Sequence, residues 1–134
     1  MLIDSSHASL LLIDIQEKLF SKIHSNELIL ERIIVMLESF SLLKLPVIYT
    51  EQYPKGLGHT IKPIKDYIEK SKLPAQKFEK TTFSCFPSGE NENKKKYIKT
   101  NQVLIAGIET HICVLQTAIE LKSLDTDVFI LEDC

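Results

Sequence analysis

Short, continuous blocks of apolar residues alternate along the chain with polar stretches that contain glycine or proline. Residues 8–15 and 103–108 carry the longest such blocks, LLLI and VLIA, which are typical of strands buried on both faces of a sheet. Shorter blocks predict three more strands at residues 47–50, 75–79 and 127–131. Because residues 75–79 are the most polar of these, we expect that strand near an edge of the sheet.

Between the predicted strands, the apolar positions follow a helical period. Residues 26–43 form a long amphipathic helix with apolar positions three and four apart: Leu30, Ile33, Ile34, Leu37, Phe40 and Leu43. Residues 61–71 and 110–123 predict two more helices, and residues 88–99 predict a polar one. Strands and helices therefore alternate, which predicts an α/β fold with a parallel sheet of five strands and right-handed crossovers.

Composition narrows the class of protein further. With 134 residues, 44% of them hydrophobic and 25% charged, the chain fits one soluble globular domain over residues 1–134. A net charge of −2 favours neither nucleic acid nor a membrane surface as partner. No apolar run approaches the ~20 residues of a membrane span, and the N-terminus has no secretion signal. Three widely spaced cysteines do not form a disulfide framework, so we expect reduced thiols and a cytoplasmic location.

Candidate chemistry collects where the predicted strands end. Asp14 ends the first strand, Lys80 ends the third, and Cys113 follows the fourth. The carboxyl ends of parallel strands lie on one rim, so we expect an acid, a cation and a thiol to meet there, near the reversal of strand order between the first and fourth strands. Each residue also has a plainer interpretation: Asp14 could cap a turn, Lys80 could be solvated, and Cys113 could be a buried packing thiol.

The segment around Cys113 has the strongest local signal. A buried strand turns at Gly107 and leads into a helix whose first turn contains Cys113. Unpaired N–H groups at a helix start favour a thiolate and can also hold an oxyanion. His111 lies two residues away, where helical side chains do not face each other, so it is a poor partner for Cys113. We interpret Cys85 and Cys134 as bystanders.

Three segments resemble the isochorismatase-like cysteine hydrolases: LLIDIQ at residues 11–16, KTTFS at 80–84 and AGIETHICV at 106–114. The segment TEQYPKGLG at residues 50–58 is similar to one branch, the isochorismatase domain-containing proteins. The resemblance covers essentially the whole chain, in order. It implies a three-layer α/β/α Rossmann-like sandwich.

The resemblance also implies a catalytic triad of Asp14, Lys80 and Cys113. Asp14 would accept the thiol proton and return it to the leaving group, Lys80 would hold Asp14, and Cys113 would attack an amide-like carbon to give a thioester-type intermediate. It further implies a cis peptide bond between Ile108 and Glu109. That bond would aim the backbone N–H groups of Glu109 and Cys113 at one point as an oxyanion hole.

The loop over residues 51–60 follows a strand, so it is either a plain connection or part of a binding site. We consider Tyr53, Leu57 and Phe83 as walls of a pocket for a small-molecule substrate. Nicotinamidases of this superfamily carry an Asp-x-His pair after the second strand. No such pair stands here and His59 alone is not a site, so we expect no metal and no cofactor.

Domains of this family usually continue for some tens of residues beyond the equivalent of Cys134. We therefore expect a C-terminally shortened domain that lacks the sixth strand, with an uncovered sheet face that favours homo-oligomers. Two classes of function follow. The first is a cysteine hydrolase of a small amide-like substrate, and the second is a non-catalytic binding or oligomerising protein with the same fold.

Overall fold

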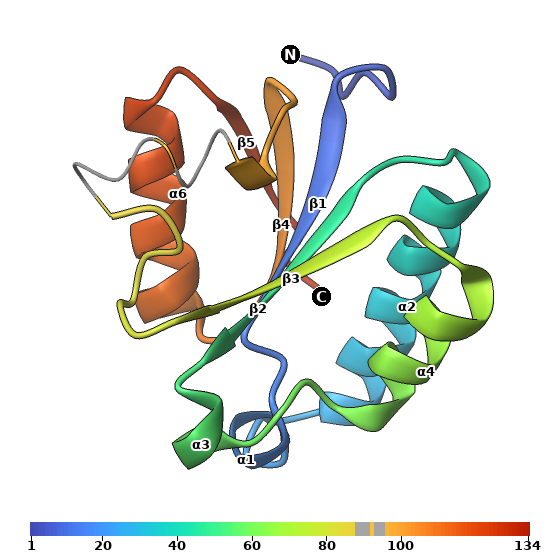
Figure 1. The fold of residues 1–134 in the computed structure, drawn as a ribbon, viewed down its shortest axis with the longest axis vertical. Helices are drawn as coiled ribbons and strands as arrows, with labels where there is room; N and C mark the ends of the chain where they lie inside the picture. Colours follow the sequence, from blue (N-terminus) through green and yellow to red (C-terminus); the bar gives the residue numbers. More distant parts are fainter. Residues whose placement is uncertain (88–91, 93–95) are drawn as a thin grey trace.

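A five-stranded, all-parallel sheet forms the centre of the molecule, in the order β3-β2-β1-β4-β5 (Figure 1). The computed structural model describes residues 1–87, 92 and 96–134. The strands are β1 (Ala8–Ile13), β2 (Val47–Gln52), β3 (Ala75–Lys80), β4 (Gln102–Gly107) and β5 (Asp127–Ile130). The predicted α/β class, the parallel sheet and the edge position of residues 75–79 are confirmed.

The two most apolar strands lie side by side at the middle of the sheet. Every residue of β1 and β4 is buried, as expected for strands covered on both faces. Their pairing runs from Ala8 opposite Gln102 to Ile13 opposite Gly107. The strand order therefore reverses between β1 and β4, so the crevice where α/β proteins bind ligands lies just beyond Ile13 and Gly107.

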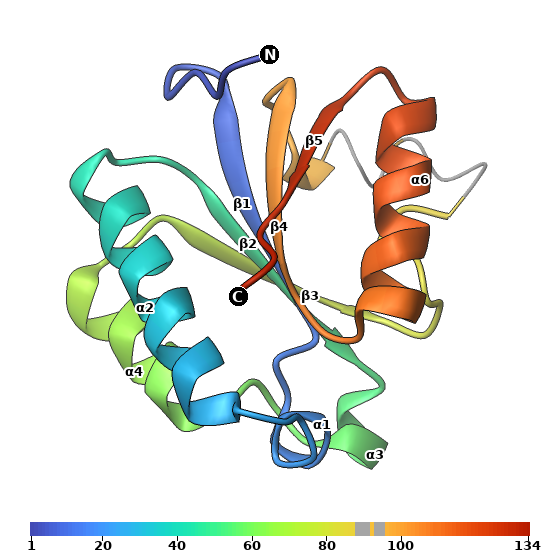
Figure 2. The same cartoon turned by 180° about the vertical axis from the view of Figure 1, so that it is seen from behind.

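Helices cover both faces of the sheet. The long helix α2 (Asn26–Leu42) and α4 (Lys62–Ser71) lie on one face, and α6 (Leu115–Ser123) lies on the other (Figures 1 and 2). The buried positions of α2 are Ile33, Leu37 and Phe40, which belong to the predicted apolar stripe. Each face of the sheet thus has its own apolar core, and the two cores meet at the buried central strands.

Several boundaries differ from the pattern-based ones. Strand β2 continues through Gln52, because its pairing with β3 extends as far as Lys80. The connection that follows contains a short helix, α3 (Pro54–Leu57), and another short helix, α1 (Glu17–Phe20), follows β1. The helix predicted over residues 110–123 begins as a π-helical turn, η1 (Thr110–Val114), before α6. The helix predicted over residues 88–99 lies mostly outside the described residues.

None of the helices in the described part of the chain is long and apolar enough to cross a membrane.

Candidate active site

Asp14 occupies a strained position directly after β1. Its φ of 54° lies in the left-handed region, which an aspartate tolerates better than most residues. The side chain is fully buried and accepts a hydrogen bond from the Thr50 hydroxyl at 2.7 Å. The Asp14 N–H donates to the same Thr50 oxygen at 3.3 Å. Thr50 on β2 therefore fixes both the backbone and one carboxylate oxygen of Asp14.

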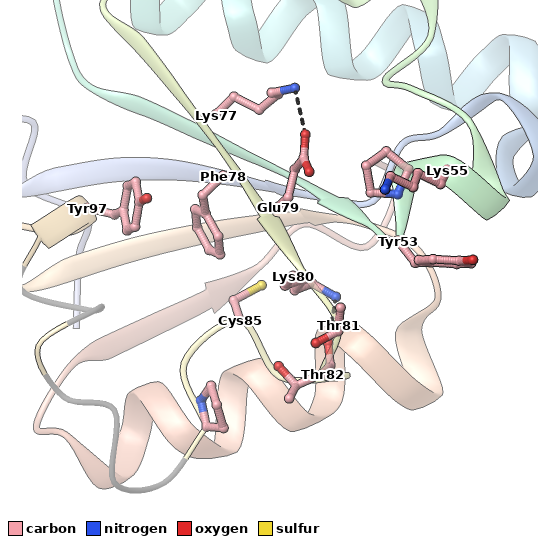
Figure 3. Close-up of a pocket in the computed structure, with 12 residues that line it drawn as sticks. Tyr53, Lys55, Lys77, Phe78, Glu79, Lys80, Thr81, Thr82, Cys85 and Tyr97 are labelled. Atoms are coloured by element: carbon pink, nitrogen blue, oxygen red, sulfur yellow. Dashed lines mark hydrogen bonds and ion pairs between the residues drawn. The ribbon is translucent and has the colours of Figure 1, made fainter.

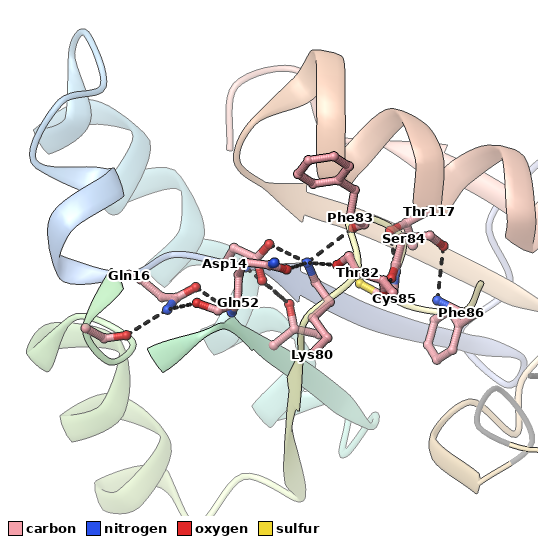
Figure 4. Close-up of polar contacts among 12 residues, drawn as sticks. Asp14, Gln16, Gln52, Lys80, Thr82, Phe83, Ser84, Cys85, Phe86 and Thr117 are labelled. Atoms are coloured by element: carbon pink, nitrogen blue, oxygen red, sulfur yellow. Dashed lines mark hydrogen bonds and ion pairs between the residues drawn. The ribbon is translucent and has the colours of Figure 1, made fainter. Parts of the chain in front are cut away.

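Lys80, the last residue of β3, reaches the other carboxylate oxygen. Its Nζ lies 2.7 Å from Oδ2 of Asp14 and 2.7 Å from Oε1 of Gln52 (Figure 4). The carbonyl oxygens of Thr82 and Phe83 lie 3.1 and 3.2 Å from the same nitrogen. Four acceptors thus surround three N–H groups, which compensates for the burial of the ammonium. These contacts hold Lys80 in place beside Asp14.

Two glutamines complete this network. The fully buried Gln16 donates from Nε2 to the carbonyl oxygens of Gln52 and Gly58, at 2.9 and 2.7 Å, and accepts from the Gln52 N–H at 2.7 Å. The Gln52 side chain in turn accepts from Lys80. A closed ring of contacts therefore joins the end of β1, the end of β2 and the end of β3. Neither Thr50 nor Gln52 was among the predicted site residues: Thr50 was expected only as part of the second strand, and Gln52 only as part of the loop after it.

Cys113 lies in the π-helical turn η1 and is only 9% exposed. Its thiol interacts with the side chains of both Asp14 and Lys80. Burial raises the pKa of the Cys113 thiol to about 11, the Lys80 charge lowers it, and the Asp14 charge raises it again. Burial beside a carboxylate thus opposes the thiolate that the helix start was expected to favour. The resting thiol is protonated and has a carboxylate beside it.

The turn between β4 and η1 leaves no room for a side chain at Gly107. Its φ is 137°, and a Cβ there would lie 2.6 Å from the Ile13 nitrogen and would also collide with the Ile13 carbonyl oxygen. The Ile108–Glu109 peptide bond that follows is cis. Among the described residues, no acceptor lies within hydrogen-bonding distance of the Glu109 N–H. Gly107 thus lets β4 end against β1, beside Asp14, and the Glu109 N–H remains available to a ligand.

A second thiol lies close to the same charges. Cys85 is 4% exposed, and its N–H donates to the Thr117 hydroxyl at 3.0 Å. Burial raises the pKa of its thiol to about 12, and the charges of Lys80 and Asp14 act on it in opposite directions. The sequence analysis treated Cys85 as a bystander, and the segment after Lys80 brings it to the edge of the site.

A hollow of about 740 Å³ opens beside Lys80 (Figure 3). Tyr53 lines it, whereas Leu57, Phe83 and Cys113 lie outside its lining. The Phe83 ring points away from Lys80, and only its carbonyl oxygen turns toward the ammonium (Figure 4). Of the three residues predicted as pocket walls, Tyr53 alone borders this hollow.

The other candidate side chains have local partners. His111 lies on the surface with Nε2 3.8 Å from a Glu109 carboxylate oxygen, and the His59 Nδ1 lies 3.0 Å from Oε2 of Glu51. The described residues contain no cluster of three or more His, Cys, Asp or Glu side chains that could hold a metal ion.

Comparisons with known proteins identify the family of this chain. The Isochorismatase domain model matches residues 8–134. Isochorismatase family protein 1A of Dictyostelium discoideum is 39% identical over 132 residues, which cover 96% of this chain and 63% of that protein. Isochorismatase domain-containing protein 2 of Xenopus laevis is 33% identical over 92% of this chain and 58% of its own length. The chain therefore belongs to the isochorismatase family.

Solved structures show the same fold. A Caenorhabditis elegans protein described as MAR1 ribonuclease superposes with a TM-score of 0.84 at 34% identity, over 98% of this chain and 65% of that one. The Escherichia coli YcaC gene product, described as an octameric hydrolase of unknown specificity, has a TM-score of 0.81 at 23% identity, over 98% of this chain and 64% of that one. The chain thus spans slightly less than two thirds of these relatives' lengths.

Proposed function

We propose that this chain carries the site of a cysteine hydrolase in which Cys113, Asp14 and Lys80 act together. The observation that supports it most is the interaction of the buried Cys113 thiol with Asp14, a buried carboxylate that is ion-paired to Lys80. A protonated thiol needs an adjacent base, and Asp14 is placed to be that base. Membership of a family that consists mostly of hydrolases agrees with this assignment.

In the proposed reaction, Asp14 takes the Sγ proton as the sulfur of Cys113 attacks the carbonyl carbon of an amide-like substrate. The carbonyl electron pair moves onto oxygen, where the N–H groups of Glu109 and Cys113 stabilise the oxyanion. Collapse breaks the carbon–nitrogen bond, and the Asp14 proton passes to the leaving amine. Water, deprotonated by Asp14, then hydrolyses the thioester and restores the thiol.

Lys80 acts on this cycle through its charge. Four oxygen acceptors surround its ammonium and fix it in place, so we assign it a purely electrostatic role. Its charge lowers the pKa of Cys113 and keeps Asp14 oriented toward the thiol. Lys80 thereby offsets part of the cost of forming a thiolate in a buried place.

We further propose a small-molecule substrate, a cytoplasmic location and a homo-oligomeric assembly, with no cofactor. The exposed rings of Tyr53 and Phe83 lie on the segments next to Lys80 and are candidates for the rim of the substrate site, with Leu57 beside them on α3. The name of the C. elegans relative refers to ribonuclease activity in that protein. The net charge of −2 gives this chain no general attraction for RNA, so we favour a small substrate.

The competing proposal is a non-catalytic protein that uses the fold for binding or oligomerisation. A panel of small amides, esters and an RNA oligonucleotide, assayed with wild type and with Cys113→Ala and Cys113→Ser, distinguishes the two. We expect hydrolysis of a small amide-like compound that falls at least about a thousandfold in Cys113→Ala. Cys134→Ser, which removes a thiol away from Asp14 and Lys80, is the matched control and keeps full activity. Activity that survives both Cys113 substitutions would exclude the cysteine mechanism.

A further inference from the structure

Strand β3 lies at the end of the sheet with one edge unpaired. Lys77 and Glu79 point to one face of the sheet, and Phe78 and Lys80 point to the other. All four side chains nevertheless line the same hollow of about 740 Å³ (Figure 3). A hollow bordered by both faces of one strand follows its free edge, so none of the described residues occupies the place of a neighbouring strand.

The backbone of β3 has a fixed set of free hydrogen-bonding groups. The Val47 N–H donates to the Pro74 carbonyl, and the Tyr53 N–H donates to the Lys80 carbonyl. Because successive residues of a strand point their N–H and C=O groups to opposite edges, even-numbered residues of β3 face β2. The N–H and C=O groups of Lys77 and Glu79 therefore face outward along the hollow, ready for another strand.

These groups restrict how a second copy of the same strand could pair. In an antiparallel pair, residues with outward-facing groups must stand opposite each other. A two-fold axis through Phe78 places Lys77 of the first copy opposite Glu79 of the second. By the same symmetry, Glu79 of the first copy lies opposite Lys77 of the second. An axis through Lys77 or through Glu79 would instead place like charges opposite each other, which is destabilising. One register thus satisfies both the hydrogen bonds and the charges.

We propose that β3 pairs antiparallel with β3 of a second copy about a two-fold axis at Phe78, which joins the two sheets into one. Self-complementary charge favours a second copy over an unrelated extended peptide, since the same two residues supply both partners of each ion pair. The register also places Gln76 of the second copy opposite Lys80, so the second copy forms a wall of the hollow. The interface does not depend on Cys113, so it stands or falls separately from the hydrolase proposal.

The test is the dimer dissociation constant, measured by sedimentation velocity. We expect wild type to form dimers and Glu79→Lys, which turns both ion pairs into lysine pairs, to weaken them at least about tenfold. Glu38→Lys makes the same charge change on the exposed surface of α2 and leaves dimerisation unaltered. Mixing Glu79→Lys with Lys77→Glu restores a dimer that contains one copy of each, because every pair across the axis is again of opposite charge.

Lys77 also contacts the buried carboxylate of Glu51 at 3.2 Å, so Lys77→Glu places a second carboxylate beside it and can destabilise the fold. Glu79→Pro tests the β3–β3 interface without the Lys77→Glu variant. It removes the outward-facing N–H of residue 79, which is not hydrogen-bonded to β2. We expect Glu79→Pro to be folded and monomeric. A wild-type chain that stays monomeric at every concentration, or a dimer that persists in both Glu79→Lys and Glu79→Pro, would overturn the proposal.

Discussion

The Lys80 ammonium lies 2.7 Å from the Asp14 carboxylate, and the two side chains are 4% and 0% exposed. They come from the ends of β3 and β1, which are not neighbours in the sheet because β2 lies between them. Thr50 and Gln52, on the intervening strand, bind one member of the pair each. Side chains of β2, the strand between β1 and β3, therefore hold both members of the charged pair in position.

Removing the cation from this pair should cost far more than removing a cation at the surface. Lys80→Met leaves the Asp14 charge buried without its partner, and we expect the free energy of unfolding to fall by roughly 3–5 kcal/mol in urea denaturation. Lys62→Met is the control, because the Lys62–Asp66 pair lies on the surface, where an ion pair contributes little to stability. Equal losses in the two variants would contradict a buried, charge-critical pair.

Gly107→Ala should be strongly destabilising. The new Cβ would lie 2.6 Å from the Ile13 nitrogen and 2.9 Å from its carbonyl carbon, at a φ that disfavours side chains. Because the obstacle is the backbone of a central strand, we expect a loss above about 3 kcal/mol, measured by thermal or urea unfolding. Gly56→Ala is the matched control, since its Cβ meets only the exposed Tyr53 ring, which can move away. A Gly107→Ala protein as stable as Gly56→Ala would contradict the close approach of β4 to β1.

Glu51 should make stability sensitive to acid. Burial raises its pKa, but hydrogen bonds from Thr60, His59 and Lys77 outweigh burial and lower it from 4.5 to about 2. A carboxyl whose pKa is depressed on folding stabilises the protein above its unfolded pKa. That contribution, about 3 kcal/mol, is lost as pH falls from 4.5 to about 2.

The measurement for Glu51 is the free energy of unfolding as a function of pH. Glu51→Gln should be less stable than wild type at pH 7 and should have a flatter slope below pH 4.5, because it has no carboxyl to protonate. Glu38→Gln, at a carboxyl on the exposed surface of α2, should keep the wild-type slope. If Glu51→Gln has the same dependence of unfolding free energy on pH below 4.5 as wild type, other carboxyls cause the loss of stability in acid and the prediction is wrong.

Much of this architecture follows from local patterns. The continuous apolar runs of β1 and β4 require burial on both faces, and the polar residues of β3 suit an edge. The positions of Asp14, Lys80 and Cys113 at strand ends follow from topology, since parallel strands end on one rim. The resemblance to the isochorismatase-like hydrolases added the idea that the three work together.

Other features depend on contacts between distant segments and leave no local signal. Gln52 holds Lys80 only because β2 and β3 stay paired to their last residues, and nothing in the sequence of residues 50–53 requires this. The protonated state of Cys113 depends on its burial beside Asp14, which opposes a thiolate. Cys85 likewise reaches the site through the path of residues 81–87, which no pattern predicted.

The Asp14 charge should affect thiol reactivity and hydrolysis in opposite directions. Because Asp14 raises the pKa of Cys113, Asp14→Asn should lower that pKa and increase alkylation of Cys113 by iodoacetamide below pH 11. The same variant should lose hydrolysis, because it has no base. Peptide mass spectrometry separates Cys113 from Cys85 and Cys134. Slower alkylation of Cys113 in Asp14→Asn than in wild type would contradict the conclusion that the Asp14 charge raises the pKa of the Cys113 thiol.

The most direct test of the hydrolase account is the mass of the protein quenched in acid during turnover of a verified substrate. The account predicts a covalent adduct equal to the acyl part of the substrate, located on the Cys113 peptide and absent in Cys113→Ala. Turnover in wild type with no adduct on Cys113 under any quench condition, together with turnover by Cys113→Ala, would contradict it.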